Sequence, residues 1–160
     1  MRSDPSQKSY TVKEATIKLM QFCAYRDRSQ KEVETKLREM RMIPQACEQI
    51  TIKLMQENFL NEERFARSFV RGKFRIKKWG RIKIKQELKQ REISAPLIKI
   101  AFTEIDDSEY ITTLEEVASK KLKLIKEPDP YKKKQKLVYY LQQRGFEIPL
   151  IIQVTEDFKF

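Results

Sequence analysis

The sequence predicts an all-α fold in which tandem three-helix repeats stack into an elongated, curved array. Its composition is helical, because Lys, Glu, Gln, Leu and Ile dominate and only three glycines and six prolines are present. Apolar residues recur at helical spacing along most of the chain. Hydrophobic residues make up 40%, which is enough for a core and argues against wholesale disorder.

An internal repeat of roughly 50 residues is the third observation. In each copy an apolar pair four residues apart precedes a polar turn, Ile or Phe, and a Ser or Pro that enters a helix. The three copies read VETKLREMRMIPQ, IKQELKQREISAP and LVYYLQQRGFEIP, and their anchors Leu37, Leu88 and Leu141 are 51 and 53 residues apart. One repeat is too small to bury a good core, so we expect stacked neighbours to share one. The alternative is three unrelated helical stretches in one bundle.

The predicted first repeat spans residues 11–58 and follows a polar, flexible segment at residues 1–10. Its first helix covers residues 11–25. The second opens with a capping box at residues 29–32, and the third has Pro44 in its first turn. The residues expected to face inward are Ala15, Leu19, Phe22, Cys23, Val33, Leu37, Cys47, Ile50, Leu54 and Met55.

The predicted second repeat spans residues 59–106. Asn61 caps a long amphipathic helix with two acidic residues in its first turn. Gly80 separates this helix from a shorter one, and Ser94 and Pro96 begin the third. The residues expected to face inward are Phe65, Ala66, Phe69, Val70, Ile84, Leu88, Leu97, Ile98, Ala101, Phe102 and Ile105.

The predicted third repeat spans residues 107–160. Its long helix opens at residues 107–108 and ends before the Pro-Asp-Pro segment at residues 128–130. Residues 144–145, Arg-Gly, cap the next helix, and Pro149 starts the last one. The residues expected to face inward are Ile111, Leu114, Val117, Ala118, Leu122, Leu137, Leu141, Ile151, Ile152 and Val154.

The excess positive charge is concentrated in one window of the second repeat. Residues 64–91 contain twelve basic residues and one acidic residue, Glu87, a net charge of +11. The whole chain has 34 basic and 23 acidic residues, which is also +11, so the remainder is neutral. A local excess of this size indicates a polyanion or an acidic partner surface.

Helical spacing places these cations in two rows with no compensating acids. The first row is Arg64, Arg67, Arg71, Arg75 and Lys78 on the long helix, and the second is Arg81, Lys85 and Lys89 on the next helix. Lys73 and Lys77 interrupt the apolar side of the long helix, so we expect it to leave the core near its C-terminal end. The alternative is that both rows are ordinary solvated helix faces.

Trp79, the single tryptophan, lies between the two rows. It is either a plug over the core or a stacking anchor in a basic groove. The lysine run at residues 132–136 would either extend the basic surface or be a solvated helix start. The predicted binding residues are Arg67, Arg71, Arg75, Lys77, Lys78, Trp79, Arg81, Lys85 and Lys89.

The sequence gives little support for an enzyme or for a metal-binding protein. The chain has no His, which removes the commonest general base and metal ligand. Its three glycines are isolated, so no phosphate-binding loop is present, and Cys23 and Cys47 form no CxxC motif. We therefore expect neither an enzyme nor a cofactor. No apolar run reaches the roughly 20 residues of a membrane span, and no signal-peptide core is evident, so we expect a cytoplasmic protein.

Two motifs resemble the RecX family, which regulates the bacterial recombinase RecA. RDRSQKEVETKL is similar to the family's Arg-x-Arg-Ser motif with its following Glu and Lys-Leu. The more specific match is FLNEERFARSFVRGKFRIKKWGRIKIKQELKQREI, and the resemblance covers about residues 11–158. Family members often have Lys-Gly after the second helix of a repeat. Residues 40–42 and 90–92 lack it, which is expected to affect the turns and leave the basic rows intact.

The resemblance implies a regulator of homologous recombination, DNA repair and the SOS response that has no catalytic activity. It implies a curved array lying in the groove of a RecA filament on single-stranded DNA. There it would inhibit strand exchange and ATP hydrolysis and promote filament disassembly. We expect a monomer that also binds DNA directly, though more weakly and without sequence specificity. The alternatives are a stand-alone DNA-binding helical module and a scaffold for an acidic protein partner.

Overall fold

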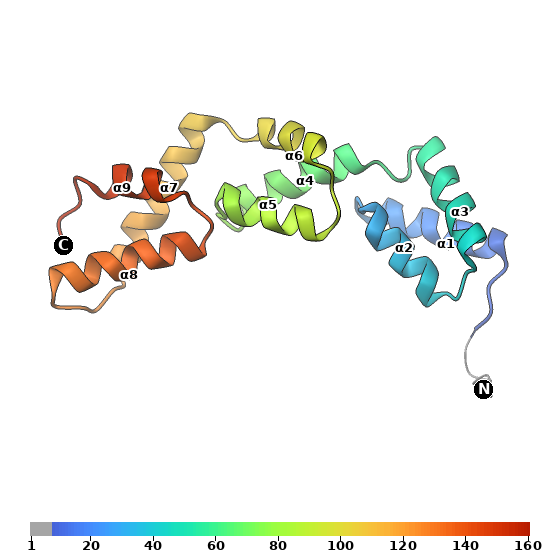
Figure 1. Ribbon diagram of the computed structural model, residues 1–160, viewed down its shortest axis with the longest axis horizontal. Coiled ribbons are helices and arrows are strands. Elements are labelled where there is room, and N and C mark those ends of the chain that lie inside the picture. The colour runs from blue at the N-terminus through green and yellow to red at the C-terminus, as the bar shows by residue number, and fades with distance from the viewer. Residues whose placement is uncertain (1–7) are drawn as a thin grey trace.

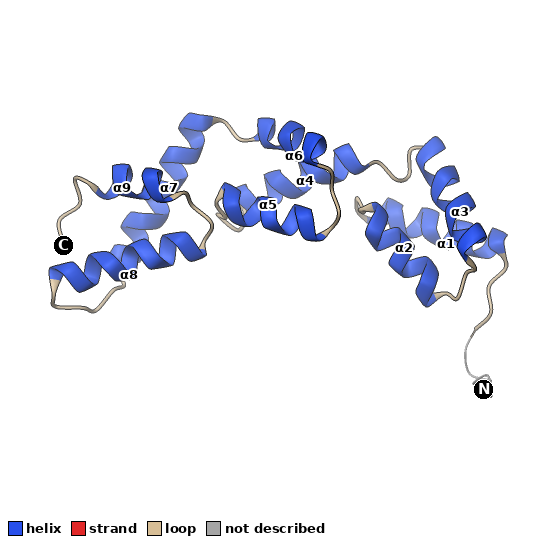
Figure 2. Ribbon diagram, viewed as in Figure 1, coloured by secondary structure: helices blue, strands red, loops and turns tan. Residues whose placement is uncertain are grey.

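The structure, a computed structural model, describes residues 8–160, which contain nine α-helices, one 3₁₀ helix and no strand. The helices are α1 (Val12–Tyr25), α2 (Gln30–Glu39), α3 (Pro44–Gln56), α4 (Glu62–Arg75), α5 (Arg81–Gln90), α6 (Ala95–Ala101), η1 (Phe102–Glu104), α7 (Asp107–Leu122), α8 (Pro130–Gln143) and α9 (Ile148–Thr155). Figure 2 shows that loops alone connect them. Of the predicted flexible segment, residues 1–7 lie outside the described residues.

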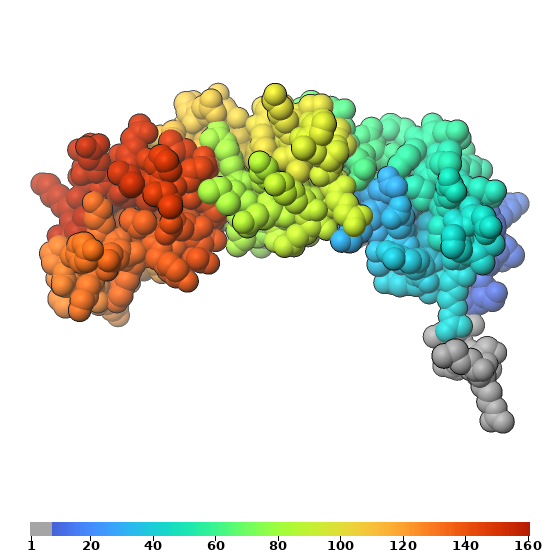
Figure 3. Space-filling view, in the orientation of Figure 1, coloured from blue at the N-terminus to red at the C-terminus, as the bar shows by residue number. Residues whose placement is uncertain are grey.

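Three groups of three helices follow one another along an arch (Figure 1). We call α1–α3, α4–α6 with η1, and α7–α9 the first, second and third repeats. Figure 3 shows one concave side, along which α5 and α8 lie in Figure 1. The predicted all-α array of tandem three-helix repeats is therefore confirmed. No helix within residues 8–160 has both the length and the apolarity that a membrane span requires.

Local sequence signals set the helix starts. The predicted capping box is present: Ser29 Oγ accepts from the backbone N–H of Glu32 at 3.2 Å, and Glu32 Oε2 accepts from Ser29 N–H at 2.8 Å. Thr11 and Glu14 form a second box at α1. Asn61 caps α4 as predicted, and prolines occupy the first turns of α3, α6, α8 and α9.

Left-handed residues follow several of the helices. Arg41, Asn58, Lys78 and Glu92 have φ between 57° and 60°, and Gly145 has φ 94°. A residue in this conformation lets the last carbonyls of a helix find partners, and Gly adopts it most easily. The turns after α2 and α5 thus keep the left-handed geometry with Arg41 and Glu92, although glycine is missing there.

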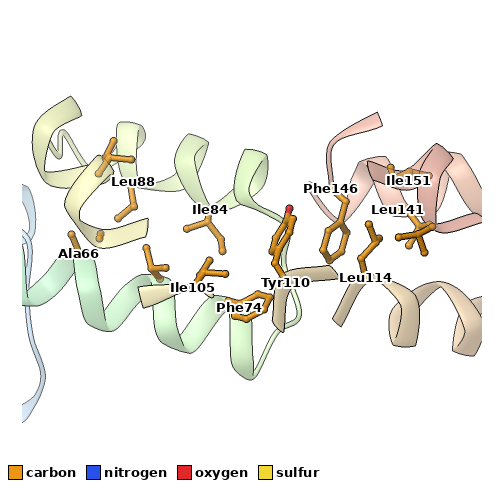
Figure 4. Packing of buried hydrophobic residues seen from close by; sticks show 14 of the residues in the cluster. Ala66, Phe74, Ile84, Leu88, Ile105, Tyr110, Leu114, Leu141, Phe146 and Ile151 are labelled. Carbon is orange, nitrogen blue, oxygen red and sulfur yellow. The ribbon is translucent and has the colours of Figure 1, made fainter. Parts of the chain in front are cut away.

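The buried residues form two separate clusters. The first repeat has its own core, built around Leu19, Leu37 and Leu54. The second and third repeats share one core that runs without a break between them. Figure 4 shows Tyr110 at its centre, between Phe74 and Phe146, with ring centroids 5.8 Å and 5.5 Å away. The expectation that all neighbouring repeats share a core is therefore wrong for the first repeat.

The joint between the second and third repeats is made by backbone as well as apolar contacts. Gly80 N–H donates to the carbonyl of Arg144 at 2.8 Å, and Ile82 N–H donates to the carbonyl of Gly145 at 3.0 Å. The N-cap residue of α5, Gly80, has no side chain to cap the helix, so carbonyls at the end of α8 accept from the N–H groups of Gly80 and Ile82, and the Tyr110 hydroxyl accepts from that of Arg81. A Cβ atom on Gly80 would collide with the Gly145 backbone.

The joint between the first and second repeats is polar. Arg64 Nε donates to Asp27 Oδ1 at 2.6 Å, and Lys31 Nζ donates to the carbonyl of Gln90 at 2.9 Å. The backbone N–H of Gln30 donates to the Glu62 carboxylate at 3.2 Å. Exposed contacts of this kind contribute little each, so this joint is held less firmly than the other one.

The positions of several residues differ from those predicted from the sequence. Phe74 is 1% exposed, so α4 stays in the core to its last turn instead of leaving it. Lys78 lies beyond the end of α4, in the left-handed conformation, and is not part of the helical row. Met55 and Ile152, predicted to face inward, are exposed. They lie on α3 and α9, which pack chiefly against the two other helices of their own repeats.

Candidate nucleic-acid and partner interface

The arginines of the first predicted row lie beside carboxylates from another part of the chain. Arg67 Nη1 and Arg71 Nη1 each contact Glu104 Oε1 at 3.1 Å, and Arg67 Nη2 also contacts Glu63 at 3.1 Å. Arg75 Nε lies 3.8 Å from Glu109. The expectation that no acids compensate the rows is wrong, because folding brings η1 and α7 beside α4.

These contacts shift the ionisation of the groups involved. The hydrogen bond from Arg67 is the main cause that lowers the pKa of Glu104, and Arg71 adds to it. The same hydrogen bond is the main cause that raises the pKa of Arg67. Both groups therefore stay charged at neutral pH, and their charges largely cancel locally.

Arg81, the first cation of the second row, is part of the joint between the second and third repeats. Its Nη2 lies 2.6 Å from Asp107 Oδ1, and its Nη1 lies 3.5 Å from Glu147 Oε2. Its guanidinium covers the Tyr110 ring at 3.9 Å from the centroid. Tyr110 accepts a hydrogen bond from the backbone N–H of Arg81 at 3.0 Å and donates one to Glu147. Burial is the main cause that raises the pKa of Tyr110, so its hydroxyl stays protonated.

The lysines of the window keep their charge uncompensated. Lys77, Lys85 and Lys89 are exposed, Lys78 is half-buried, and none of these four forms an ion pair within residues 8–160. Lys85 and Lys89 share one side of α5, four residues apart. The structure thus divides the predicted site residues into paired arginines and free lysines.

Trp79 is half-buried and packs against the shared core. Lys73 Nζ and Lys83 Nζ lie 4.9 Å and 4.4 Å from its ring centroid, within the range of cation–π contacts. Trp79 therefore closes the end of the core and also holds two cations at the surface. Lys73 and Lys83 are not among the binding residues that the sequence predicted, although both lie within six residues of Trp79.

No group of three or more Cys, Asp or Glu side chains in residues 8–160 is placed to bind a metal ion. Cys23 is buried and Cys47 half-buried, and both are free thiols. The fold and this surface define a class of helical-repeat protein with a basic surface.

Comparison with known proteins identifies the family. Residues 61–101 match the model of the second three-helix domain of RecX, and residues 107–155 match that of the third. The chain therefore belongs to the RecX family, whose curated members are named regulatory proteins.

Several relatives show how far the similarity extends. The chain is 31% identical over 147 residues to the regulatory protein RecX of Clostridium acetobutylicum, which covers 89% of this chain and 68% of that protein. It is 33% identical over 122 residues to the RecX protein of Chlorobium phaeobacteroides, covering 76% of this chain and 78% of that one. The match to the Lactobacillus johnsonii protein spans only 34% of that relative.

Solved structures show the same fold. The crystal structure of RecX from Lactobacillus salivarius superposes with a TM-score of 0.82 at 22% identity, over 91% of this chain and 95% of that chain. A second crystal structure of a regulatory protein RecX superposes with a TM-score of 0.84 at 20% identity, over 91% of this chain and 73% of that chain. The curved array of three-helix repeats is thus shared at low sequence identity.

Proposed function

We propose that this protein is a regulator without catalytic activity that binds RecA and RecA–DNA filaments, inhibits the recombinase and its ATPase activity, and promotes filament disassembly. The observation that carries the proposal is the family match across the second and third three-helix domains. The elongated, curved body suits the helical groove of a filament (Figure 3). In this proposal the protein acts in the cytoplasm as a monomer in homologous recombination and DNA repair.

The free lysines of the second repeat are the proposed contact residues. Lys77, Lys85 and Lys89 are exposed and carry uncompensated charge, which suits the phosphates of filament DNA or an acidic protein surface. Arg67 and Arg71 already bind Glu104 and would contribute only after that carboxylate is displaced. The proposed contact residues therefore lie mainly on α5, whereas the sequence had indicated α4 as well.

Co-sedimentation tests the proposal directly. The protein is mixed with RecA filaments assembled on single-stranded DNA, with naked DNA and with free RecA. Strong enrichment on the filaments over both other samples is the expected result, and inhibition of ATP hydrolysis should follow at the same concentrations. Equal binding to naked DNA would contradict the proposal and favour a stand-alone DNA-binding module.

A pair of variants tests the proposed contact residues. Lys85→Ala with Lys89→Ala should weaken filament binding without unfolding the protein, because exposed helix substitutions cost little stability. If both lysines meet phosphates of a single strand, each lost contact lowers the slope of log K against log salt by about 0.7. Lys13→Ala with Lys53→Ala removes the same charge from exposed positions of the first repeat and is the control. Equal binding by the two variants would exclude α5 as the contact surface.

A further inference from the structure

Charge is divided unequally along the chain from the end of the second repeat through the third. Residues 103–116 contain six acidic residues and no basic one, whereas residues 117–144 contain nine basic and two acidic residues, a net charge of +7. Glu104, Asp107 and Glu109 of the acidic part pair with arginines of the second repeat. The fold thus neutralises much of the central window and leaves a second basic region uncompensated.

Two adjoining hollows lie in this basic region, beside α7 and α8. Their volumes are about 600 Å³ and about 450 Å³, and both are lined by Lys121 and Tyr140. We call these two adjoining hollows the α7–α8 furrow. Its lining cations include Lys78, Lys120, Lys121, Lys123, Lys126 and Arg144.

Most of the furrow's positive charge is free. Within residues 8–160, none of Lys120, Lys121, Lys123 and Lys126 forms an ion pair, whereas Lys136 binds Glu127 at 2.8 Å. The acidic residue that lines the furrow is Glu116. A groove with this many unpaired lysines raises the local concentration of polyanions.

Aromatic side chains lie among these lysines. Tyr139 is 64% exposed, and Tyr140 is half-buried with Lys121 Nζ 4.5 Å from its ring centroid. Cations that follow a backbone, together with aromatic rings on which bases stack, are the features of sites for single-stranded nucleic acid. Because the lining lysines are divided between two adjoining hollows, from Lys78 to Lys126, the furrow suits a chain of several phosphates better than a compact ligand such as a free nucleotide.

We propose that the α7–α8 furrow binds the phosphate backbone of single-stranded nucleic acid, with bases stacking on Tyr139. The furrow begins at Lys78, which the second repeat contributes beside Arg144 of the third. A strand in the furrow would therefore leave it close to the free lysines of the second repeat. The site does not depend on the proposed action on RecA, because its chemistry requires only a nucleic-acid strand.

Fluorescence anisotropy with a labelled oligothymidylate of about 20 nucleotides tests this site, since single-strand sites span about 4–16 nucleotides. The assay contains no recombinase. Lys120→Ala with Lys123→Ala should weaken binding about tenfold at low salt and lower the salt slope by about 1.4, because two phosphate contacts are lost. Tyr139→Ala should weaken binding by about fivefold or more if a base stacks on it.

The control again combines Lys13→Ala with Lys53→Ala, which makes the same change in net charge on the first repeat. Circular dichroism confirms that each variant is folded. Equal affinity of the furrow variant and this control would overturn the inference. Filament co-sedimentation of the same variants is a separate measurement, so loss of filament binding with intact oligonucleotide binding would count against this site and not against the proposed function.

Discussion

At the scale of single residues, the arginines of residues 64–91 form ion pairs and the lysines of that window form none within residues 8–160. Arg67, Arg71 and Arg81 reach carboxylates from distant segments, and the planar guanidinium suits such pairing. The lysines of α5 remain in solvent, where their charge is available to a partner. Within residues 64–91, side-chain type thus separates the cations that form ion pairs from those that form none.

Glu104→Gln should strengthen oligonucleotide binding several-fold at neutral pH. Glu104 pairs with both Arg67 and Arg71, so removing its charge frees Arg71 and leaves Arg67 with Glu63 as its only acidic partner within residues 8–160. The salt slope should become steeper, by about 0.7 for each new phosphate contact. Fluorescence anisotropy across a salt series measures both changes.

The pH dependence follows from the lowered pKa of Glu104. Its folded pKa lies below the ordinary value of 4.5, so the stabilisation from its ion pairs is complete above that pH and is lost as the pH falls through the folded pKa. The wild type and Glu104→Gln should therefore converge in affinity as the pH falls below 4.5. Glu57→Gln, at an exposed position without an ion pair in residues 8–160, is the control for net charge. If Glu104→Gln and Glu57→Gln raise the affinity for the oligonucleotide equally, the increase does not come from the loss of the ion pairs of Glu104 with Arg67 and Arg71.

At the scale of the elements, the glycines determine how closely two helices approach. Gly80 begins α5 against the backbone of Gly145, with no space for a Cβ atom between them. Gly72 lies within α4, and a Cβ atom there would meet nothing within 4 Å. The same residue type is thus required at one position and dispensable at the other.

Gly80→Ala should destabilise the protein by about 1–3 kcal/mol or more, because the new methyl group forces the joint apart. Gly72→Ala should stabilise it by about 0.5–1 kcal/mol, because Ala favours the helix and nothing obstructs it. Urea unfolding followed by circular dichroism measures both. If both substitutions change the free energy of unfolding similarly, the backbones of Gly80 and Gly145 do not approach each other closely.

The helices themselves were largely predictable, because their signals are local. The capping box at Ser29, the cap at Asn61 and the proline at position 44 each act within one turn of the helix they start. Phe74 was missed because neighbouring lysines obscure the apolar side of α4. Its partner Tyr110 lies 36 residues away on α7, and no local pattern indicates that contact.

At the scale of the whole molecule, two separate cores predict two unfolding steps. The first repeat's cluster contains nine buried residues, and the cluster shared by the other repeats contains eighteen. The two clusters do not merge, and the contacts described above between the two parts are polar, so unfolding of one need not unfold the other. The single tryptophan, Trp79, packs on the larger cluster.

In urea, the loss of helical circular dichroism should therefore begin before Trp79 fluorescence changes. Leu19→Ala should destabilise the first repeat by about 2–5 kcal/mol and leave the fluorescence midpoint unchanged. Leu114→Ala, in the shared core, should lower the fluorescence midpoint. Coincident transitions by both probes, displaced equally by both substitutions, would show one cooperative unit instead.

The arrangement of the binding surface was less predictable than the array itself. The repeat spacing predicted the three-helix groups, because Leu37, Leu88 and Leu141 are each fully buried. The charge window was visible in the sequence, but its neutralisation was not, since Glu104 approaches Arg67 from 37 positions away. The α7–α8 furrow was also not evident from the net charge of the sequence. The acidic residues of segment 103–116 offset the positive charge of segment 117–144.

The joint between α8 and α5 also sets an order of assembly during synthesis. The first repeat holds a complete core of its own, so it can fold as soon as it leaves the ribosome. At the start of helix α5, the N–H groups of Gly80 and Ile82 find their partners in the carbonyls of Arg144 and Gly145, and that of Arg81 in the Tyr110 hydroxyl. This joint can therefore form only after residue 145 of the 160 has been synthesised.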